Sequence, residues 1–243
     1  MRSILKKEIS AFFSSFTGYI AIGIFLVANA WFMWINPGEW NIIDGGFATI
    51  DTLFIIAPWV YLFLIPAITM RSFAEEKKSG TIEILLTQPI TDTQLVMGKY
   101  LASVVLALFA LVPTVIYYIS VYQMGNPVGN IDAGGTWGSY IGLFFLAASY
   151  VSVGIFTSSL TDNQIISFII AAVICFFLYT GFDGLSRLEF LKPIDELILS
   201  LGINEHYKSM SRGVIDSRDV LYFLSLITLF LGAAGLKLAA RKW

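Results

Sequence analysis

The residues that could do chemistry in this sequence are few, and they form no catalytic or metal-binding set. His206 is the single histidine, and neither a His-Glu-x-x-His zinc motif nor a Gly-x-Ser-x-Gly nucleophile motif occurs. Asp183 resembles half of an intramembrane aspartyl site, but that chemistry needs a second carboxylate at membrane depth. Cys175 lies in an apolar block, where a free thiol behaves as a small hydrophobic side chain. We therefore expect no catalytic residue, metal or cofactor in this chain.

Nucleotide binding is not expected either. The sequence lacks the Gly-x-x-x-x-Gly-Lys-[Ser/Thr] loop that cradles nucleotide phosphates, so the energy for any work has to come from a partner. The net charge of −2 offers no strongly basic surface to nucleic acid. Hydrophobic residues make up 57% of the chain and charged residues 13%, against about 25% charged residues in soluble domains. This composition indicates an integral membrane protein built from helices.

Six segments have the ~20 apolar residues with which a helix crosses a bilayer. The predicted spans are residues 16–35, 52–70, 101–122, 140–158, 165–182 and 220–240. No small-residue cleavage site follows the first segment, so we interpret it as a retained span rather than a signal peptide. We expect a single all-α membrane domain over residues 1–243.

The interior of the spans limits the possible functions. None has an ionisable residue near its centre, which argues against a carrier driven on its own by protons or ions. Pro58, Pro66 and Pro113 lie inside spans, where each removes a helical hydrogen bond. Such prolines act either as packing kinks or as hinges of a moving helix.

Lysine and arginine residues predict the orientation. They gather in residues 2–7, 71–99 and 237–242, whereas loops 36–51 and 123–139 contain none. The loop 183–219 carries both basic and acidic residues. By the positive-inside rule, both termini and the loop between the second and third spans are cytoplasmic.

The loop between the second and third spans is expected to be structured. Arg71–Lys78 can continue the second span as a charged helix that ends at Ser79-Gly80. Thr81–Thr87 can form a short helix with Ile82, Leu85 and Leu86 on one face, ended by Pro89. Thr91 or Asp92 would cap the next helix. Such a loop can carry force from a soluble partner, or it can merely fix the orientation of the spans.

Two further amphipathic helices are predicted at the membrane surface. The first precedes the first span, with apolar residues at helical spacing: Ile4, Leu5, Ile9, Phe12, Phe13 and Phe16. The second lies in the outer loop, from Pro193 to Gly202, with Ile194, Leu197, Ile198 and Leu201 on one face. It could cap a translocation path, bind a partner, or simply cover the end of the bundle.

Together these features resemble the membrane subunit of a type-2 ATP-binding-cassette (ABC) transporter. The resemblance is most specific over residues 70–100: Arg71, the acidic-basic run 75–78, Gly-Thr-x-Glu-x-Leu-Leu-Thr at 80–87, Pro89, and Gly-Lys-Tyr at 98–100. In that family the first helix is an interfacial elbow, and a coupling helix lies between spans two and three. Outer helices lie between spans five and six.

Within the family, residues 207–220 and the Tyr-Phe-Leu at 222–224 resemble the permease of the gliding-motility ABC transporter. A similar Arg-Gly-Val-Ile-Asp segment, here at 212–216, occurs in the related permease that serves maturation of a copper enzyme, nitrous oxide reductase. The resemblance therefore implies a role in surface motility and a place in the bacterial cytoplasmic (inner) membrane.

The resemblance also implies partners and site residues. ATP and magnesium would bind a separate ABC ATPase subunit, next to a second permease copy or paralogue and a membrane-anchored accessory subunit in the lipid bilayer. The residues that couple to the ATPase would be Glu75, Glu76, Gly80, Thr81, Ile82, Glu83, Leu85 and Leu86. The outer-loop residues that contact a partner or act as a gate would be Ile194, Leu197, Ile198, Arg212 and Asp216.

Two other functions remain open from the sequence. A membrane scaffold that anchors a cytoplasmic ATPase without transport would use the same docking loop. A solitary secondary carrier would need no ATPase, although the uncharged spans argue against it.

Overall fold

The computed structural model describes residues 2–86, 90–213 and 215–240, and within these ranges the chain is helical with no strand. Six helical segments are long and apolar enough to cross a membrane, so the predicted all-α fold with six spans is confirmed. They cover Gly18–Ile35, Asp51–Lys78, Asp92–Met124, Ala133–Leu160, Gln164–Ser186 and Ser217–Ala239. Several extend beyond the predicted bounds, because polar turns continue the helices past the apolar core.

Most spans are built from more than one helical piece. The first joins α2 (Phe16–Ala30) to the π-helical η1 (Trp31–Ile35), and the second joins α4 (Asp51–Thr69) to α5 (Arg71–Lys78). The third span consists of α7 (Asp92–Leu111), η2 (Val112–Thr114) and α8 (Val115–Met124), and the fourth is α9 (Ala133–Leu160). The fifth consists of α10 (Gln164–Phe176), η3 (Phe177–Gly181) and α11 (Phe182–Ser186), and the sixth is α14 (Ser217–Ala239).

Side chains that accept backbone N–H groups mark where several helices begin. Thr91 and Gln94 form a capping box at the start of α7, which confirms the predicted cap at this position. Asp132 caps α9, Asn163 caps α10 and Asp216 caps α14. Pro113 lies in η2, where the third span changes from α-helix to a short 3-10 turn.

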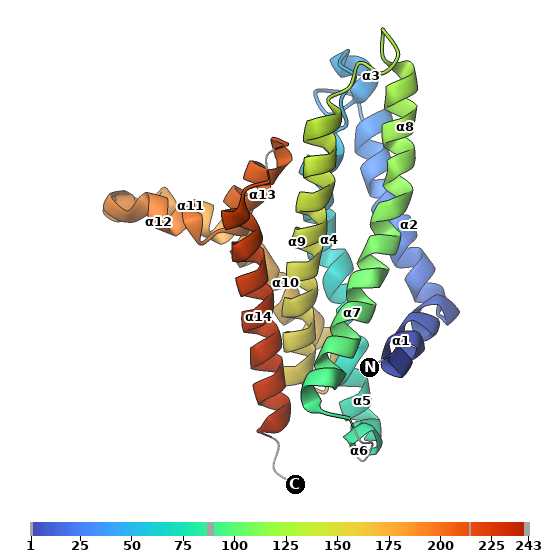
Figure 1. The fold of residues 1–243 in the computed structure, drawn as a ribbon, viewed down its shortest axis with the longest axis vertical. Coiled ribbons are helices and arrows are strands. Elements are labelled where there is room, and N and C mark those ends of the chain that lie inside the picture. The colour runs from blue at the N-terminus through green and yellow to red at the C-terminus, as the bar shows by residue number, and fades with distance from the viewer. Residues whose placement is uncertain (1, 87–89, 214, 241–243) are drawn as a thin grey trace.

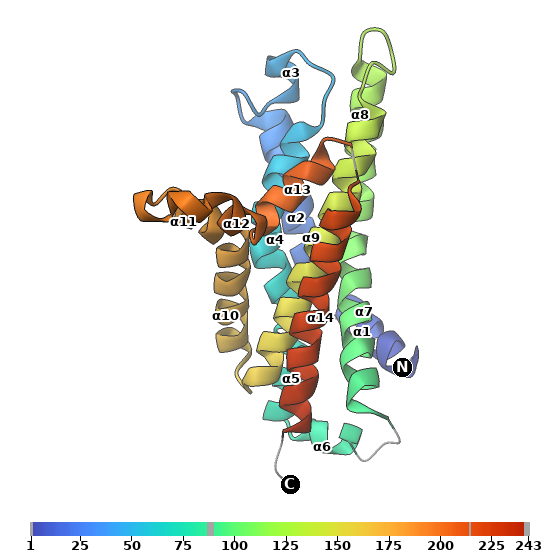
Figure 2. The same cartoon turned by 60° about the vertical axis from the view of Figure 1, so that its left-hand side comes forward.

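The helices form an elongated bundle with α9 at its centre (Figures 1 and 2). In the most apolar stretch of the fourth span, α9, 78% of residues are buried. The corresponding share is 22% in the first, fifth and sixth spans. The lower end in Figure 1 holds α1 (Arg2–Ser14), α5 and α6 (Thr81–Leu86), together with both ends of the chain. The upper end holds α3 (Ile42–Gly45) and α8.

Small residues let neighbouring helices approach α9 closely. A Cβ at Gly154 would overlap the hydroxyl of Thr69 on α4 and lie 2.7 Å from the Thr69 Cβ. A Cβ at Gly142 would lie 3.3 Å from the ring of Tyr207. Close packing through small residues is the usual way in which membrane helices associate, because lipid provides no hydrophobic driving force between them.

Beyond α11, the last piece of the fifth helical segment, the chain continues as η4 (Glu189–Ile194), α12 (Asp195–Ser200) and α13 (Ile203–Ser211). Periodicity predicts one helix here, from Pro193 to Gly202, and the family resemblance implies several outer helices. The piece from α11 to α12, residues 182–200, projects sideways from the bundle and is called the side arm below (Figures 1 and 2).

Helix α13 returns from the side arm and packs against α9. Ile203, Tyr207 and Met210 are buried and share one helix face at spacings of four and three. His206 Nδ1 lies 2.7 Å from Asp219 Oδ1 of α14, and the His206 ring stacks on Tyr222. These contacts fix α13 to the first turns of α14.

The packing of α9 against α4 gives a testable prediction. Gly154→Ala places a methyl group on the Thr69 hydroxyl, so we expect the free energy of unfolding to fall by roughly 2 kcal/mol. The thermal unfolding midpoint of the purified protein in detergent measures this effect. Gly23→Ala in α2 is the matched control, since its added Cβ meets nothing within 4 Å. Equal midpoints for the two variants would contradict the proposed close contact.

Candidate functional site

Helix α6 hangs at the lower end of the bundle, joined to α5 by a tight turn (Figures 1 and 2). Gly80 has a φ of +71°, a conformation that favours glycine, and it ends the charged helix as predicted. Glu75, Gly80, Thr81 and Glu83 are exposed, whereas Ile82 is half-buried against the core. The backbone of Leu85 and Leu86 is helical; their side chains, and residues 87–89 with the predicted stop at Pro89, lie outside the described parts.

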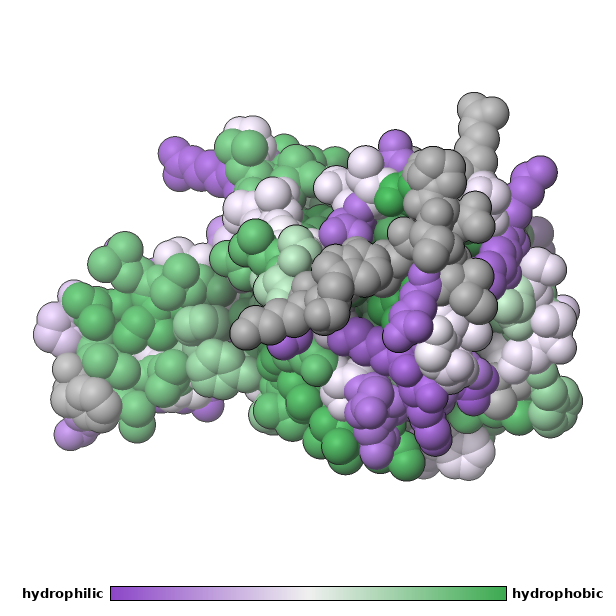
Figure 3. Space-filling view, turned by 90° about the horizontal axis from the view of Figure 1, so that it is seen from below, coloured by the Kyte–Doolittle hydropathy of each residue, from purple (hydrophilic) through white to green (hydrophobic). Residues whose placement is uncertain are grey.

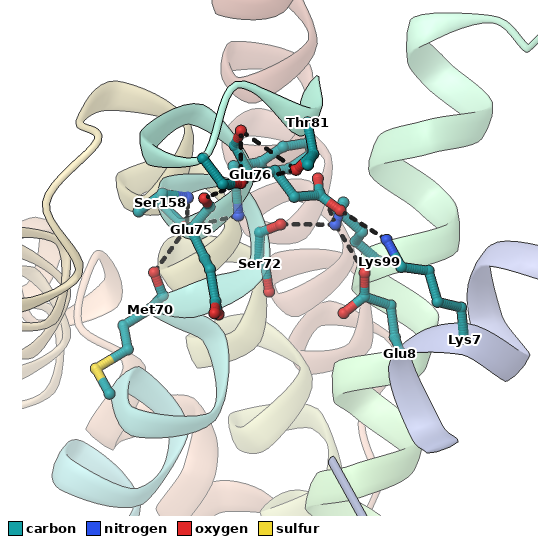
Figure 4. A network of polar contacts seen from close by, with 12 residues as sticks. Lys7, Glu8, Met70, Ser72, Glu75, Glu76, Thr81, Lys99 and Ser158 are labelled. Atoms are coloured by element: carbon teal, nitrogen blue, oxygen red, sulfur yellow. Dashed lines mark hydrogen bonds and ion pairs between the residues drawn. The ribbon is translucent and has the colours of Figure 1, made fainter. Parts of the chain in front are cut away.

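The junction between α4 and α5 is held by a hydroxyl from α9. Ser158 Oγ accepts hydrogen bonds from the backbone N–H of Phe73 (2.9 Å) and of Ala74 (3.1 Å). The same hydroxyl donates to the carbonyl of Met70 at 3.0 Å (Figure 4). Lys77 on α5 also donates to the carbonyl of Ser159. The direction in which α5 leaves α4 is therefore set by the end of α9.

A fully buried lysine lies beside this junction. Lys99 on α7 is 1% exposed, and its ammonium contacts groups from two other helices. The Lys99 Nζ lies 2.7 Å from Glu8 Oε1 on α1 and 2.9 Å from Glu76 Oε2 on α5. It also donates to the Ser72 carbonyl at 2.6 Å and lies 5.1 Å from the centre of the Phe73 ring. One side chain thus joins α1, α5 and α7.

Glu76 completes the network by contacting two cations (Figure 4). Its Oε1 accepts a hydrogen bond from Lys7 Nζ at 3.1 Å, and its Oε2 faces Lys99. The sequence predicts Glu76 as a polar contact for a partner, but in the structure it is 8% exposed and its carboxylate pairs with Lys7 and Lys99. Glu8, Glu76, Lys7 and Lys99 carry two negative and two positive charges, so the cluster is neutral. We call it the four-charge cluster.

Helix α1 packs on α7 through apolar contacts as well as charges. Ile4 is buried, and a Cβ at Gly98 would lie 3.2 Å from its Cγ2. Phe13 meets Phe109 edge-to-face, with 5.1 Å between ring centres. The predicted apolar face of the first helix therefore contacts α7, and Ser15 ends the helix before the first span begins.

The lower surface outside this cluster is polar. Figure 3 looks at this end and shows hydrophilic residues gathered over the bundle, while the side arm beside it is mostly hydrophobic. Exposed basic residues here include Arg71, Lys78 and Lys237. This surface, from which α6 emerges, can receive a soluble partner that carries acidic or polar groups.

The outer-loop residues singled out from the sequence lie far from α6 in Figures 1 and 2. On the side arm, Ile194 and Leu197 are exposed and Ile198 is half-buried. Arg212 is exposed at the end of α13. Asp216 Oδ1 accepts the Arg218 N–H at 2.9 Å, which gives Asp216 a role in capping α14. The two predicted sets of site residues thus lie in separate parts of the molecule.

Comparison with known proteins identifies the kind of membrane protein that has this arrangement. Residues 5–234 match the family described as ABC-2 family transporter protein. The chain belongs to the ABC-2 transporter family. It is 27% identical over 139 residues to YbhR, a probable multidrug ABC transporter permease of Escherichia coli (strain K12), and equally similar to the protein of that name from Escherichia coli O157:H7. The match covers 56% of this chain and 33% of each relative, so it spans about a third of their length.

In this ABC-2 protein, Lys7, Glu8, Lys99 and Ser158 are the functional candidates that sequence reasoning missed. A signal was present for Lys99, because a lone lysine among the apolar residues of a helix needs a buried counter-charge. No comparable signal marks Glu8, which lies 91 residues from Lys99 in the chain. Among the described residues, no group of three His, Cys, Asp or Glu side chains could hold a metal ion.

The four-charge cluster gives a second prediction. Lys99→Met removes the ammonium and leaves Glu8 and Glu76 without their shared partner, so we expect a loss of about 3 kcal/mol in the free energy of unfolding. Denaturant unfolding of the purified protein measures it. The exposed Lys78→Met is the matched control.

Neutralising the partners tests whether charge is the cause. The variant Glu8→Gln/Glu76→Gln/Lys99→Met has no unpaired buried charge, so it should regain most of the lost stability. If the single Lys99→Met variant unfolds at the same denaturant concentration as the wild type, the cluster does not hold α1 and α5 to α7.

Proposed function

We propose that the chain is the non-catalytic permease subunit of an ABC transporter, and that α6 couples it to a separate ABC ATPase. The observation that carries this proposal is the four-charge cluster, which joins α5, the helix leading into α6, to α1 and α7 through a buried ammonium. Membership of the ABC-2 family supports the general function. Exposure of Thr81 and Glu83 at the lower end supports α6 as the docking element.

The proposed mechanism follows the contacts of α5. A force on α6 reaches α5 through the Ser79-Gly80 turn, where the Thr81 hydroxyl of α6 donates to the Glu76 carbonyl of α5 at 3.5 Å. It then passes to α9 through Ser158 and to α1 and α7 through Lys99. Because α4 and α5 meet at this same junction, movement of α5 changes the tilt of the second span. ATP-driven closure of the ATPase would thereby shift the bundle between two states.

The proposed docking surface of α6 combines Ile82, Leu85 and Leu86 with exposed polar groups around them. Apolar anchors commonly occupy the centre of an interface, and polar residues its rim. Glu75, Thr81 and Glu83 are suited to the rim, because all three are exposed. Glu76 is better suited to transmission than to docking, because its carboxylate already pairs with Lys7 and Lys99.

The proposal includes the surroundings of the subunit. ATP and magnesium bind the ATPase, and a second permease copy or paralogue completes the membrane part, with a membrane-anchored accessory subunit beside it. The location is the bacterial cytoplasmic membrane with both termini in the cytoplasm. Gathering of Lys and Arg at the end that holds α1 and α6 supports this orientation.

For the physiological role we propose gliding motility, on the resemblance of residues 207–224. Efflux of several drugs is the competing role, since the Escherichia coli relative is named as a probable multidrug permease. Deleting the gene separates them, because the first role predicts loss of surface motility and the second predicts increased drug sensitivity.

The coupling role of α6 can be tested by placing negative charges on its predicted apolar face. We expect Leu85→Asp/Leu86→Asp to abolish co-purification of the ATPase and to lower ATP turnover at least tenfold in membranes that contain both subunits, because a buried carboxylate is costly in an apolar interface. The control is Ile43→Asp, an equally apolar exposed position in α3 at the other end of the chain. Unchanged complex formation and ATP turnover would refute the coupling role of α6.

A scaffold that anchors the ATPase without transport predicts a different behaviour of the side arm. In the permease, trapping the ATPase with a non-hydrolysable nucleotide should change the rate at which Leu197→Cys reacts with a water-soluble maleimide. Leu197 is 68% exposed, and the native Cys175 is buried and does not interfere. An identical rate with and without nucleotide, in a complex that still binds ATPase, supports the scaffold.

A further inference from the structure

A cavity of about 680 Å³ lies in the upper half of the bundle, where the side arm leaves it. Its walls come from α4, η3, α11 and α13, and α9 contributes Ser139. In Figure 2 these elements meet at the upper end of α10. This region is far from α6, and the coupling mechanism does not use it.

The lower wall of the cavity is apolar and opens onto the outer surface of the spans. Ile55 and Trp59 lie one and two turns below Asp51 on one face of α4, and are 48% and 43% exposed. The Trp59 ring meets the Tyr179 ring edge-to-face at 5.6 Å and lies 6.5 Å from the exposed Phe176. This wall therefore offers exposed apolar side chains to a hydrocarbon chain.

The upper wall carries charges of both signs. Arg187 and Lys208 are exposed on this wall, and within the described residues neither has an ion-pair partner. The carboxylate of Asp51 lies on the same wall, as does that of Asp183, which accepts a hydrogen bond from Asn204 Nδ2 at 2.6 Å. Cations that line one cavity suit a phosphate, and carboxylates that line it suit an ammonium group.

The distance over which the wall changes from charged to apolar can be compared with the thickness of one head-group region. Asp51 and Trp59 are eight residues apart on α4, which corresponds to about 12 Å along a helix. The head-group region of one leaflet is about 5–8 Å thick, half of the ~10–15 Å that both regions add to a hydrocarbon core of ~30 Å, so about 12 Å reaches from the head groups into the hydrocarbon. The side chains of the cavity thus change from charged to apolar in the same direction as one leaflet changes from head groups to hydrocarbon.

The walls of the cavity are held in place by hydrogen bonds between elements. Tyr207 on α13 donates its hydroxyl to the Phe54 carbonyl on α4 at 2.7 Å. Burial raises the pKa of Tyr207 well above its usual value, so the hydroxyl keeps its proton. Ser139 on α9 donates to the Ser211 carbonyl at 3.2 Å. A cavity with fixed walls loses little conformational freedom when a ligand binds.

We propose that this cavity binds the head group of a zwitterionic phospholipid from the adjoining leaflet, with phosphate at Arg187 and Lys208 and the ammonium group at Asp51 and Asp183. The acyl chains leave along Ile55 and Trp59. This site goes beyond the coupling function, because binding needs neither nucleotide nor an ATPase.

The test uses the purified full chain in detergent, with lipid removed, titrated with three probes and read by native mass spectrometry. The probes are dioctanoyl phosphatidylethanolamine, dioctanoyl phosphatidylglycerol and dioctanoylglycerol, which has no phosphate. We expect phosphatidylethanolamine to bind at least tenfold more tightly than dioctanoylglycerol. Arg187→Gln/Lys208→Gln should remove this preference, and Asp51→Asn should weaken phosphatidylethanolamine binding while leaving phosphatidylglycerol unaffected.

The matched control is Arg218→Gln, an exposed arginine near the start of α14 that does not line the cavity and should leave all three affinities unchanged. Equal binding of phosphatidylethanolamine and dioctanoylglycerol overturns the proposal, as does an unchanged preference in Arg187→Gln/Lys208→Gln. Displacement of the lipid by millimolar inorganic phosphate alone shows a site for soluble phosphate, and this also overturns it. A circular dichroism spectrum like that of the wild type establishes that each variant is folded.

Discussion

The arrangement of the lower end depends on keeping one buried ammonium compensated. Lys99 is removed from water, and a charge so placed is tolerated only when counter-charges and hydrogen-bond acceptors surround it. The required groups come from α1 and α5, which the Lys99 ammonium joins to α7. This requirement acts together with the apolar contacts of α1 on α7 and with the Ser158 hydrogen bonds to α5, and it thereby contributes to where α6 emerges.

The central helix α9 is the second element on which this arrangement depends, because it contacts other helices near its start and near its end. Near its end, Ser158 supplies the hydrogen bonds that hold α5 against α4, and Gly154 lets α4 approach. Near its start, Gly142 makes room for α13, which bears one wall of the cavity. Because one straight helix contacts both regions, a tilt of α9 at the lower end displaces the cavity wall at the upper end. The proposed coupling and the proposed lipid site thus share a mechanical element.

Much of the fold follows from the sequence, because apolar segment length, helix caps and helix-breaking glycines are local signals. The six spans, the Thr91 cap and the break at Gly80 are of this kind. The four-charge cluster is not local, since Lys99 meets Ser72 from 27 residues away and Glu8 from 91. The sequence shows that Glu76 is charged, but not which way it turns. The cavity cannot be predicted from local signals either, because its walls come from segments that only the tertiary fold brings together.

The side arm has a consequence for the membrane around the protein. Its residues Leu188, Ile194 and Leu197 are exposed, and it projects from one side of the bundle at one level only. An arm that lay in the interface of that leaflet would add cross-sectional area there and none in the opposite leaflet. Such a wedge-shaped outline fits a bilayer in which the leaflet with the wider part is on the convex side. A preference for curved membrane would then follow from the side arm alone.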